Sequence, residues 1–419
     1  MRTCSHPRAL FCGGWMKGGR SRTASAAFLA LTAVLLASSA ADAKREHKSL
    51  TSCSSFSSNA EIGTTFADYE TTYPDIASAF SVGTSVDGRT IYGLKISADV
   101  DTESEEPEIR IIGAIHGNEC IAAEMVLTIA DWLLTGYGDD ATASDLVDGA
   151  EIVLVPLVNP DGYSSSFASR YNSNGVDLNR NLGFGFVPNV DDAGDEPFSE
   201  PETIALRDMS EASSFALGLS YHTEAAYVNA AWNYRPEHPR DEDLFDAIGD
   251  AYKGSSSYSV VFGWDWYMIS GDVNDWSLGT QGTFDWTIEL RNDDALEWST
   301  IHNDGVAAYL PFVFQGVSGV VTDAETSEPL AARILVSPAG EPVFTDPDLG
   351  DFHRILLPGT YDITVEANGY VSQRATDVVV SSGATTELDF ALAAGGGGYA
   401  FKVNRMVLPE TISNESYSS

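Results

Sequence analysis

Basic residues, cysteine and long apolar runs are all scarce in this chain of 419 residues. Lys and Arg number 23 against 61 Asp and Glu, which gives a formal net charge of −38 at pH 7. A surface this acidic repels the phosphates of nucleic acids and anionic lipid headgroups. We therefore expect no nucleic-acid partner, and look for the function among other classes.

Cysteine is too rare here for a disulfide framework, since the chain has only 4. Cys4 and Cys12 lie in the N-terminal segment described next, which leaves Cys53 and Cys120. An exported protein would allow these two to form a disulfide. The alternative is that both are small buried thiols.

Long apolar runs are missing beyond the N-terminus, so we expect no membrane span in the mature chain. At the N-terminus, basic residues precede an apolar run at 26–37 and a stretch of small residues ending at Ala43. This order predicts a secretory signal peptide over residues 1–43, with a buried helix as the alternative. We expect secretion to the extracellular space or periplasm, and a flexible lead-in over 44–59 without a bulky pro-domain.

Residues 60–315 predict an α/β domain, because buried strands alternate with helical patterns. Such alternation is typical of a mixed, largely parallel sheet with helices on both faces. Asp87-Gly88 predicts a hairpin turn, and Ser199-Glu-Pro-Glu202 predicts a helix N-terminus with a capping box. The expected strands cover 81–86, 90–96, 108–115, 151–158, 215–221 and 282–290, and the expected helices cover 121–134 and 199–209.

Residues 316–393 lack a helical pattern and contain short β-branched runs separated by turns, which predicts a small all-β sandwich. The runs cover 319–322, 332–336, 359–365 and 376–380. Residues 394–419 read as a Gly-rich linker and an unstructured tail. The sequence does not indicate a partner for the β domain.

Three residues form a candidate metal site. His116 and Glu119 follow a predicted strand, and both side chains are suitable zinc ligands, but His-x-x-Glu alone is weak evidence. His222 stands at the end of another buried strand, where ligands bind in open α/β sheets. Two His and one Glu leave a fourth zinc position open for water, as in hydrolytic sites.

A further carboxylate, Glu289, interrupts a third apolar strand. An unpaired buried carboxylate is costly, so it needs a reason. It could pair with Arg291. Alternatively, it is a general base directed at a zinc-bound water.

The polar segment from Arg170 to Asn181 contains two arginines and several amides in a chain that is poor in arginine. Arginine binds carboxylates through two parallel hydrogen bonds, and asparagine adds a neutral donor. A solvated loop is the alternative to the anion site that we expect here.

Taken together, these motifs resemble the zinc metallocarboxypeptidases over residues 60–315, and they occur in the family's order. The segment 267–276 also resembles the family's mobile-tyrosine loop. Residues 316–393 resemble the transthyretin-like module of the family's regulatory (N/E-type) branch. The motifs are His116-Gly-Asn-Glu119, Asn159-Pro-Asp-Gly162, Gly175-Val-Asp-Leu-Asn-Arg-Asn181, Ser199-Glu-Pro-Glu-Thr203, His222 and Thr287-Ile-Glu-Leu-Arg291.

The resemblance implies one Zn²⁺ bound by His116, Glu119 and His222, and hydrolysis that releases single amino acids from peptide or protein C-termini. Asp177 would orient His116. The remaining implied roles are base for Glu289, oxyanion stabiliser for Arg170, and grip on the terminal carboxylate for Asn179, Arg180 and Tyr267.

The resemblance leaves the preferred terminal residue open. Asn233 and Asn274 occupy the two positions where family members that favour Lys or Arg carry an acidic residue. Asp272 is the remaining acidic candidate, so a basic preference and a broad or neutral preference are both compatible with the sequence.

Two other enzyme types and one non-enzyme share this scaffold. Amide deacylases are disfavoured by the set Arg170, Asn179, Arg180 and Tyr267. Cytosolic tail-trimming enzymes are disfavoured by the export signal. An inactive binding module is disfavoured because every expected ligand is present. The acidic stretch Asp191–Glu196 could hold Ca²⁺, although a solvated loop is the reading we favour.

Overall fold

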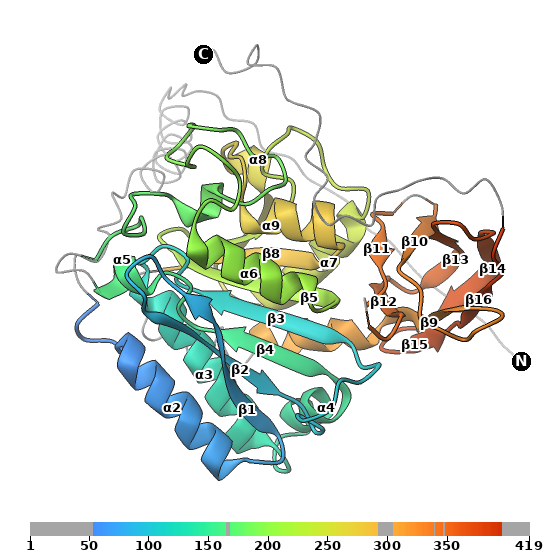
Figure 1. Cartoon of the computed structure of the whole chain (residues 1–419), viewed down its shortest axis with the longest axis horizontal. Helices are drawn as coiled ribbons and strands as arrows, with labels where there is room; N and C mark the ends of the chain where they lie inside the picture. The colour runs from blue at the N-terminus through green and yellow to red at the C-terminus, as the bar shows by residue number, and fades with distance from the viewer. Residues whose placement is uncertain (1–52, 165–167, 292–304, 339, 347, 396–419) are drawn as a thin grey trace, which may run out of the picture. The chain divides into compact units, whose positions relative to one another are not determined.

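The computed structural model describes residues 53–164, 168–291, 305–338, 340–346 and 348–395 (Figure 1). The predicted signal peptide, most of the lead-in and nearly all of the tail lie outside these residues. Among the described residues, no single helix has the length and apolar composition to cross a membrane. The pair α3 (Cys120–Gly136) and α4 (Ala141–Gly149), bent by 96°, meets that test only when taken together.

The larger region is built on an eight-stranded sheet in the order β1-β2-β4-β3-β5-β8-β6-β7. Its central strands β4, β3, β5 and β8 run parallel, whereas β1, β2 and β6 join antiparallel neighbours. The predicted mixed, largely parallel sheet is therefore confirmed. The strands are β1 (Ala77–Thr84), β2 (Thr90–Ile96), β3 (Glu108–Gly113), β4 (Glu151–Val155), β5 (Phe215–Thr223), β6 (Tyr227–Ala230), β7 (Ser259–Phe262) and β8 (Phe284–Leu290).

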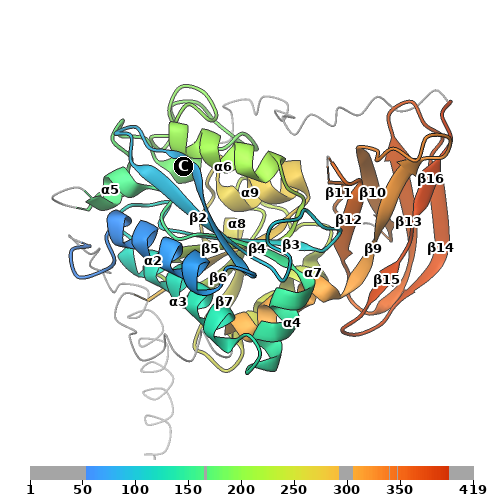
Figure 2. The same ribbon diagram turned by 60° about the horizontal axis from the view of Figure 1, so that its bottom comes forward.

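Helices cover both faces of this sheet (Figures 1 and 2). One face is packed by α2 (Asn59–Thr72), α3, α4 and α7 (Glu242–Lys253), and the opposite face by α6 (Pro201–Glu211) and α9 (Val273–Trp276). The strands are apolar on both sides because both sides are buried. Shorter helical pieces are α5 (Pro160–Ser164), α8 (Gly263–Trp266) and α11 (Ala307–Tyr309).

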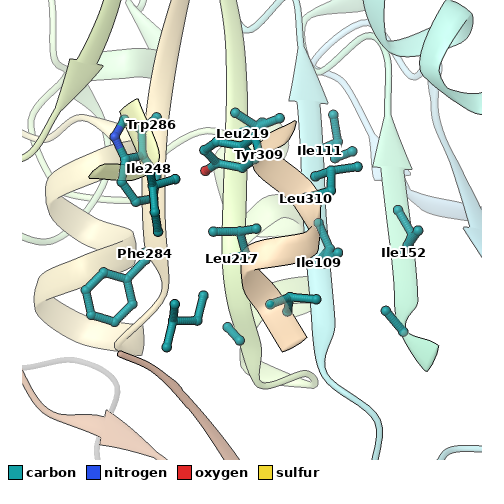
Figure 3. Packing of buried hydrophobic residues seen from close by; sticks show 14 of the residues in the cluster. Ile109, Ile111, Ile152, Leu217, Leu219, Ile248, Phe284, Trp286, Tyr309 and Leu310 are labelled. Atoms are coloured by element: carbon teal, nitrogen blue, oxygen red, sulfur yellow. The ribbon is translucent and has the colours of Figure 1, made fainter. Parts of the chain in front are cut away.

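Figure 3 shows how the alternation along the strands builds the core on one face. Ile109 and Ile111 on β3 line up with Leu217 and Leu219 on β5. Tyr309 lies beside Leu219, and its hydroxyl donates to the Gly218 carbonyl on β5. Strand residues two apart share a face, so the rows follow from the sequence pattern.

The structure confirms the predicted hairpin but contradicts the predicted capping box. β1 and β2 pair antiparallel across the turn that contains Gly88, whose φ is 77°. Helix α6 begins at Pro201 after Glu200, with no capping bond from a side chain. Ser199 instead bonds to Asn181 and Glu200, and the Glu202 carboxylate accepts from the Val86 backbone N–H.

Residues 316–395 form two small sheets, as the β-sandwich prediction requires. One has the order β11-β10-β13-β14 and the other β12-β9-β15, with β16 paired to β9. The four predicted strands are all present, and four shorter ones were missed. The strands are β9 (Gly316–Asp323), β10 (Ala332–Ser337), β11 (Val343–Phe344), β12 (Asp351–Ile355), β13 (Gly359–Ala367), β14 (Gln373–Val380), β15 (Thr385–Glu387) and β16 (Phe390–Leu392).

Candidate metal centre and substrate pocket

The three candidate ligands come together because β3 and β5 are parallel neighbours. Gly113 at the end of β3 pairs with Tyr221 on β5, so the loop carrying His116 and Glu119 reaches His222. The carboxyl ends of parallel strands meet at one edge of the sheet, which is where such sites form.

The donor atoms of these residues face one another. Glu119 Oε1 lies 2.8 Å from His116 Nδ1, and its Oε2 lies 3.0 Å from His222 Nδ1. The two Nδ1 atoms are 3.1 Å apart. Two nitrogens bound to one tetrahedral zinc at about 2.0–2.1 Å would lie roughly 3.3 Å apart. The set of two imidazoles and one carboxylate therefore fits a zinc ion in spacing and in chemistry.

The electrostatics of the site favour the ligand forms of these side chains. Burial would raise the pKa of Glu119, but the neighbouring His116 and His222 hold that pKa well below its ordinary value. Burial lowers the pKa of His222, which keeps its imidazole neutral. A charged carboxylate and a neutral imidazole are the states that bind metal.

Asp177 lies behind His116, as the sequence predicted. Its Oδ1 is 3.2 Å from His116 Nε2, and its Oδ2 accepts a 2.7 Å hydrogen bond from Arg170 Nε. Burial would raise the pKa of Asp177, but His116, Arg170 and Arg180 outweigh this effect and hold the pKa below its ordinary range. The charged carboxylate therefore faces Nε2 of His116, and Nδ1 of the same ring faces Glu119.

Glu289 lies on β8 directly beside His222, its partner in the strand register. The side chain is buried, and burial followed by the charge of Glu119 raises its pKa well above the ordinary value. Arg291, the alternative partner, has its guanidinium 5.7 Å from the centre of the Tyr258 ring.

The polar segment brings its arginines to the same place. Arg170 Nη1 is 3.3 Å from His116 Nδ1. Arg180 is buried, its Nη1 donates to the Asn179 carbonyl over 2.8 Å, and its Nε has no hydrogen-bond partner among the described residues. The Asn179 side-chain oxygen accepts from the Val273 N–H over 3.0 Å. Tyr267 is 45% exposed, and both arginines counter the rise that burial causes in its pKa.

Comparison with known proteins identifies the family. A family model described as zinc carboxypeptidase matches residues 62–309, and one described as a carboxypeptidase regulatory-like domain matches residues 316–393. The chain belongs to the zinc carboxypeptidase family.

Relatives of this zinc carboxypeptidase include carboxypeptidase D of Mus musculus, with 32% identity over 360 residues. That alignment covers 76% of this chain but only 26% of the relative, so the chain spans about a quarter of its length. The carboxypeptidase N catalytic chain of Mus musculus is 28% identical over 375 residues, covering 76% of this chain and 82% of the relative.

Solved structures support the zinc carboxypeptidase fold. The crystal structure of carboxypeptidase A from Helicoverpa armigera matches with a TM-score of 0.53 and 23% identity, covering 68% of this chain and 78% of that one. Thrombin activatable fibrinolysis inhibitor matches with a TM-score of 0.54 and 22% identity, covering 60% and 71%.

The three residues that the sequence placed in the zinc carboxypeptidase's specificity pocket belong to one buried network. Asn233 Nδ2 donates to Asp272 Oδ2 over 2.7 Å, and the Thr287 hydroxyl donates to Asn274 Oδ1 over 2.8 Å. Asn229 joins the two halves, because its amide donates to Asn233 Oδ1 and its carbonyl accepts from Asn274. The sequence did not predict that Asn229 and Thr287 belong to this network. Both are polar residues in buried strands, Thr287 in the predicted strand over 282–290 and Asn229 in β6, which was not predicted.

Two acceptors of this network have no hydrogen-bond partner among the described residues. They are Asp272 Oδ1 and Asn229 Oδ1, and both residues are buried. Burial raises the pKa of Asp272 to about 6 against the effect of Arg180, and burial with Asp272 raises the pKa of Asp275 further.

The acidic stretch Asp191–Glu196 does not gather into a metal-sized group among the described residues. Besides the His–Glu–His set, one other group lies close enough, and it consists of Glu103, Glu108 and Glu151. Lys95 Nζ lies 2.5 Å from Glu151 there, so that group already has a counter-charge. Only the first group combines nitrogen and oxygen donors.

Cys53 and Cys120 form a disulfide, with their Cα atoms 5.4 Å apart. Of the two alternatives that the sequence left open, the structure selects the bridge. Cys120 directly follows the candidate ligand Glu119 and is the first residue of α3.

Proposed function

We propose that this chain is a secreted zinc metallocarboxypeptidase that hydrolyses the last peptide bond of peptides or proteins and releases single amino acids. The observation that carries the proposal is the convergence of His116, Glu119 and His222 with Glu289, the strand-register partner of His222. Export rests on the predicted signal peptide over residues 1–43. We assign the activity to residues 60–315 and treat 316–393 as a separate module.

His116, Glu119 and His222 would hold the ion. When bound, zinc supplies Lewis-acid activation of the scissile carbonyl and of water. Glu289 takes the proton of the attacking water and later gives it to the leaving amine. Its position beside His222 in the strand register suits this role, because it places the carboxyl next to the candidate ligands.

The two arginines interact with different groups of the substrate, one with the scissile carbonyl and the other with the terminal carboxylate. Arg170, placed 3.3 Å from His116 Nδ1, stabilises the negative charge that develops on the carbonyl oxygen. Arg180, Asn179 and Tyr267 bind the terminal carboxylate, and the unpartnered Nε of Arg180 is a donor available for it. A grip on a free carboxylate restricts cleavage to the last residue.

The test compares two peptides that differ only in a free or an amidated C-terminus, with product release followed by mass spectrometry. We expect rapid release of the last residue from the free peptide and little from the amidated one. Treatment with a chelator should stop release, and added Zn²⁺ should restore it. Equal cleavage of both peptides, or full activity after chelation, would overturn the proposal.

We further propose that Asp272 decides which last residue is removed. Its free oxygen and that of Asn229 would accept hydrogen bonds from a donor side chain, and a charge on Asp272 would favour Lys or Arg. A panel of peptides varied at the last residue should show Asp272→Asn losing about 10- to 100-fold in kcat/KM for Lys and Arg but little for Leu. A uniform loss across the panel would make Asp272 a structural residue only.

A further inference from the structure

Three consecutive residues at the end of α8, next to the proposed substrate site, have exposed side chains. Trp266 is 37% exposed, Tyr267 45% and Met268 41%. Large apolar side chains exposed in a row need an explanation, since soluble proteins rarely place them together without a use. The carboxylate grip proposed above explains Tyr267 but not Trp266.

The Trp266 ring packs against two tyrosines. It packs edge-to-face against Tyr267, with ring centres 4.6 Å apart and planes at 81°. It also packs against Tyr227, with ring centres 5.0 Å apart and planes at 73°. Both arrangements are favourable for aromatic pairs.

Tyr227 ties this stack to the catalytic strand. It lies on β6, where its partner in the antiparallel register is Glu289 on β8. The stack therefore runs from the neighbour of the proposed base, through Trp266, to the tyrosine proposed to grip the substrate.

The backbone around Tyr267 is anchored on both sides. The Trp264 N–H donates to the Trp232 carbonyl over 3.0 Å, and the Ile269 N–H donates to the Asn233 carbonyl over 3.1 Å. The Tyr267 N–H itself donates to the Gly263 carbonyl. With the main chain held, the direction of the phenol depends on what its side chain contacts. Its hydroxyl interacts with Arg180, and its ring packs against Trp266.

We propose that Trp266 is a positioning residue, which Tyr227 supports from behind and which holds the Tyr267 hydroxyl in line for the terminal carboxylate of a peptide. The inference rests on the proposed carboxypeptidase function. Trp266 acts through Tyr267, so its loss should weaken substrate binding and leave the chemical step in place.

The experiment measures kcat and KM of the full chain on a peptide with a free C-terminus. We expect Trp266→Ala to raise KM about three- to tenfold, the range of one aromatic pair, with kcat within twofold of wild type. Trp266→Phe should recover most of the loss, because a smaller ring can still pack edge-on. Trp264→Phe, a change on the same short helix, serves as the matched control and should leave both constants unchanged.

A double-mutant cycle separates positioning from direct contact. In a Tyr267→Phe background, where the hydroxyl is gone, Trp266→Ala should add little to KM. Binding of the same peptide to Glu289→Gln, followed by calorimetry, should weaken by the same factor when Trp266→Ala is added. An unchanged KM, an additive effect in the Tyr267→Phe background, or an equal loss with Phe and Ala at 266 would overturn the inference. Failure of wild type to cleave and of Glu289→Gln to bind would instead overturn the proposed function.

Discussion

Two buried charged networks in the same sheet are built on opposite principles. Arg110 on β3 is fully buried, and its guanidinium donates to Ser210, Ser277 and Asp285. Every charge there has an opposite partner. In the His116–Glu119–His222 group, by contrast, two imidazole nitrogens face each other over 3.1 Å around one carboxylate.

The difference teaches how to tell a structural network from a functional one. We call the Arg110 network closed because its cation and its anion neutralise each other: Arg110 Nη1 and Nη2 donate to two hydroxyls and to the Asp285 carboxylate. Arg110 Nε and Asp285 Oδ1 are the two atoms of this network that lack a partner among the described residues. The ligand group is open, because its acceptor atoms converge on a common point. Buried polar groups that do not hydrogen-bond to one another lower the stability of the fold unless a ligand binds them.

The largest expected effect lies beside the open group. Glu289→Gln should lower kcat by about 10²- to 10⁴-fold, the usual contribution of a general base, because the amide cannot take a proton. Zinc content by atomic absorption and the thermal midpoint should stay near wild type. A variant that still cleaves at a near-normal rate would remove Glu289 from the mechanism.

Breaking the closed network should cost stability. Arg110→Met leaves the Asp285 carboxylate buried without its cation, which should lower the free energy of unfolding by roughly 3–5 kcal/mol. Urea unfolding measures the loss. The double variant Arg110→Met/Asp285→Leu should recover part of it, and a single variant as stable as wild type would contradict the comparison.

Metal removal should distinguish the two networks thermodynamically. A ligand present at 100 times its Kd stabilises the folded state by about 2.7 kcal/mol, so a chelator should lower the thermal midpoint of the wild type. The same treatment of His222→Ala should change little. An equal fall in both proteins would mean that the chelator acts elsewhere.

The smallest effect concerns one hydroxyl of the closed network. Ser277 Oγ lies 3.0 Å from Asp285 Oδ2, and Ser277→Ala should lower the free energy of unfolding by about 1 kcal/mol. Chelator response should be unchanged. If Ser277→Ala lowered the free energy of unfolding more than Arg110→Met does, the hydroxyl would matter more to that network than the cation, contrary to our expectation.

The sequence predicted the open group better than the closed one. His116, Glu119 and His222 each stand where an apolar strand ends, and strand ends can be read from local pattern. Arg110 also stands out as a charge inside a buried strand, but its partner Asp285 lies 175 positions away. Local pattern shows that such a group needs a partner without showing which one.

The capping-box error has the same origin. Ser199 and Glu202 have the residue types and spacing of a cap, yet tertiary hydrogen bonds from Asn181 and Val86 use their side chains. The places of Asn229 and Thr287 in the buried network around Asn233 and Asn274 were likewise not predicted, because short polar side chains in strands have no distinctive spacing. Side-chain partners that are distant in sequence are what the pattern could not supply.

The bridge between Cys53 and Cys120 has a consequence for a chain exposed to other proteases. It joins positions 67 apart, and the second cysteine adjoins the candidate metal ligand Glu119. A single cut in the surface loop around residues 99–106 would therefore yield two fragments that stay covalently joined. On a denaturing gel such nicked enzyme should migrate as one species without reductant and as two species with it.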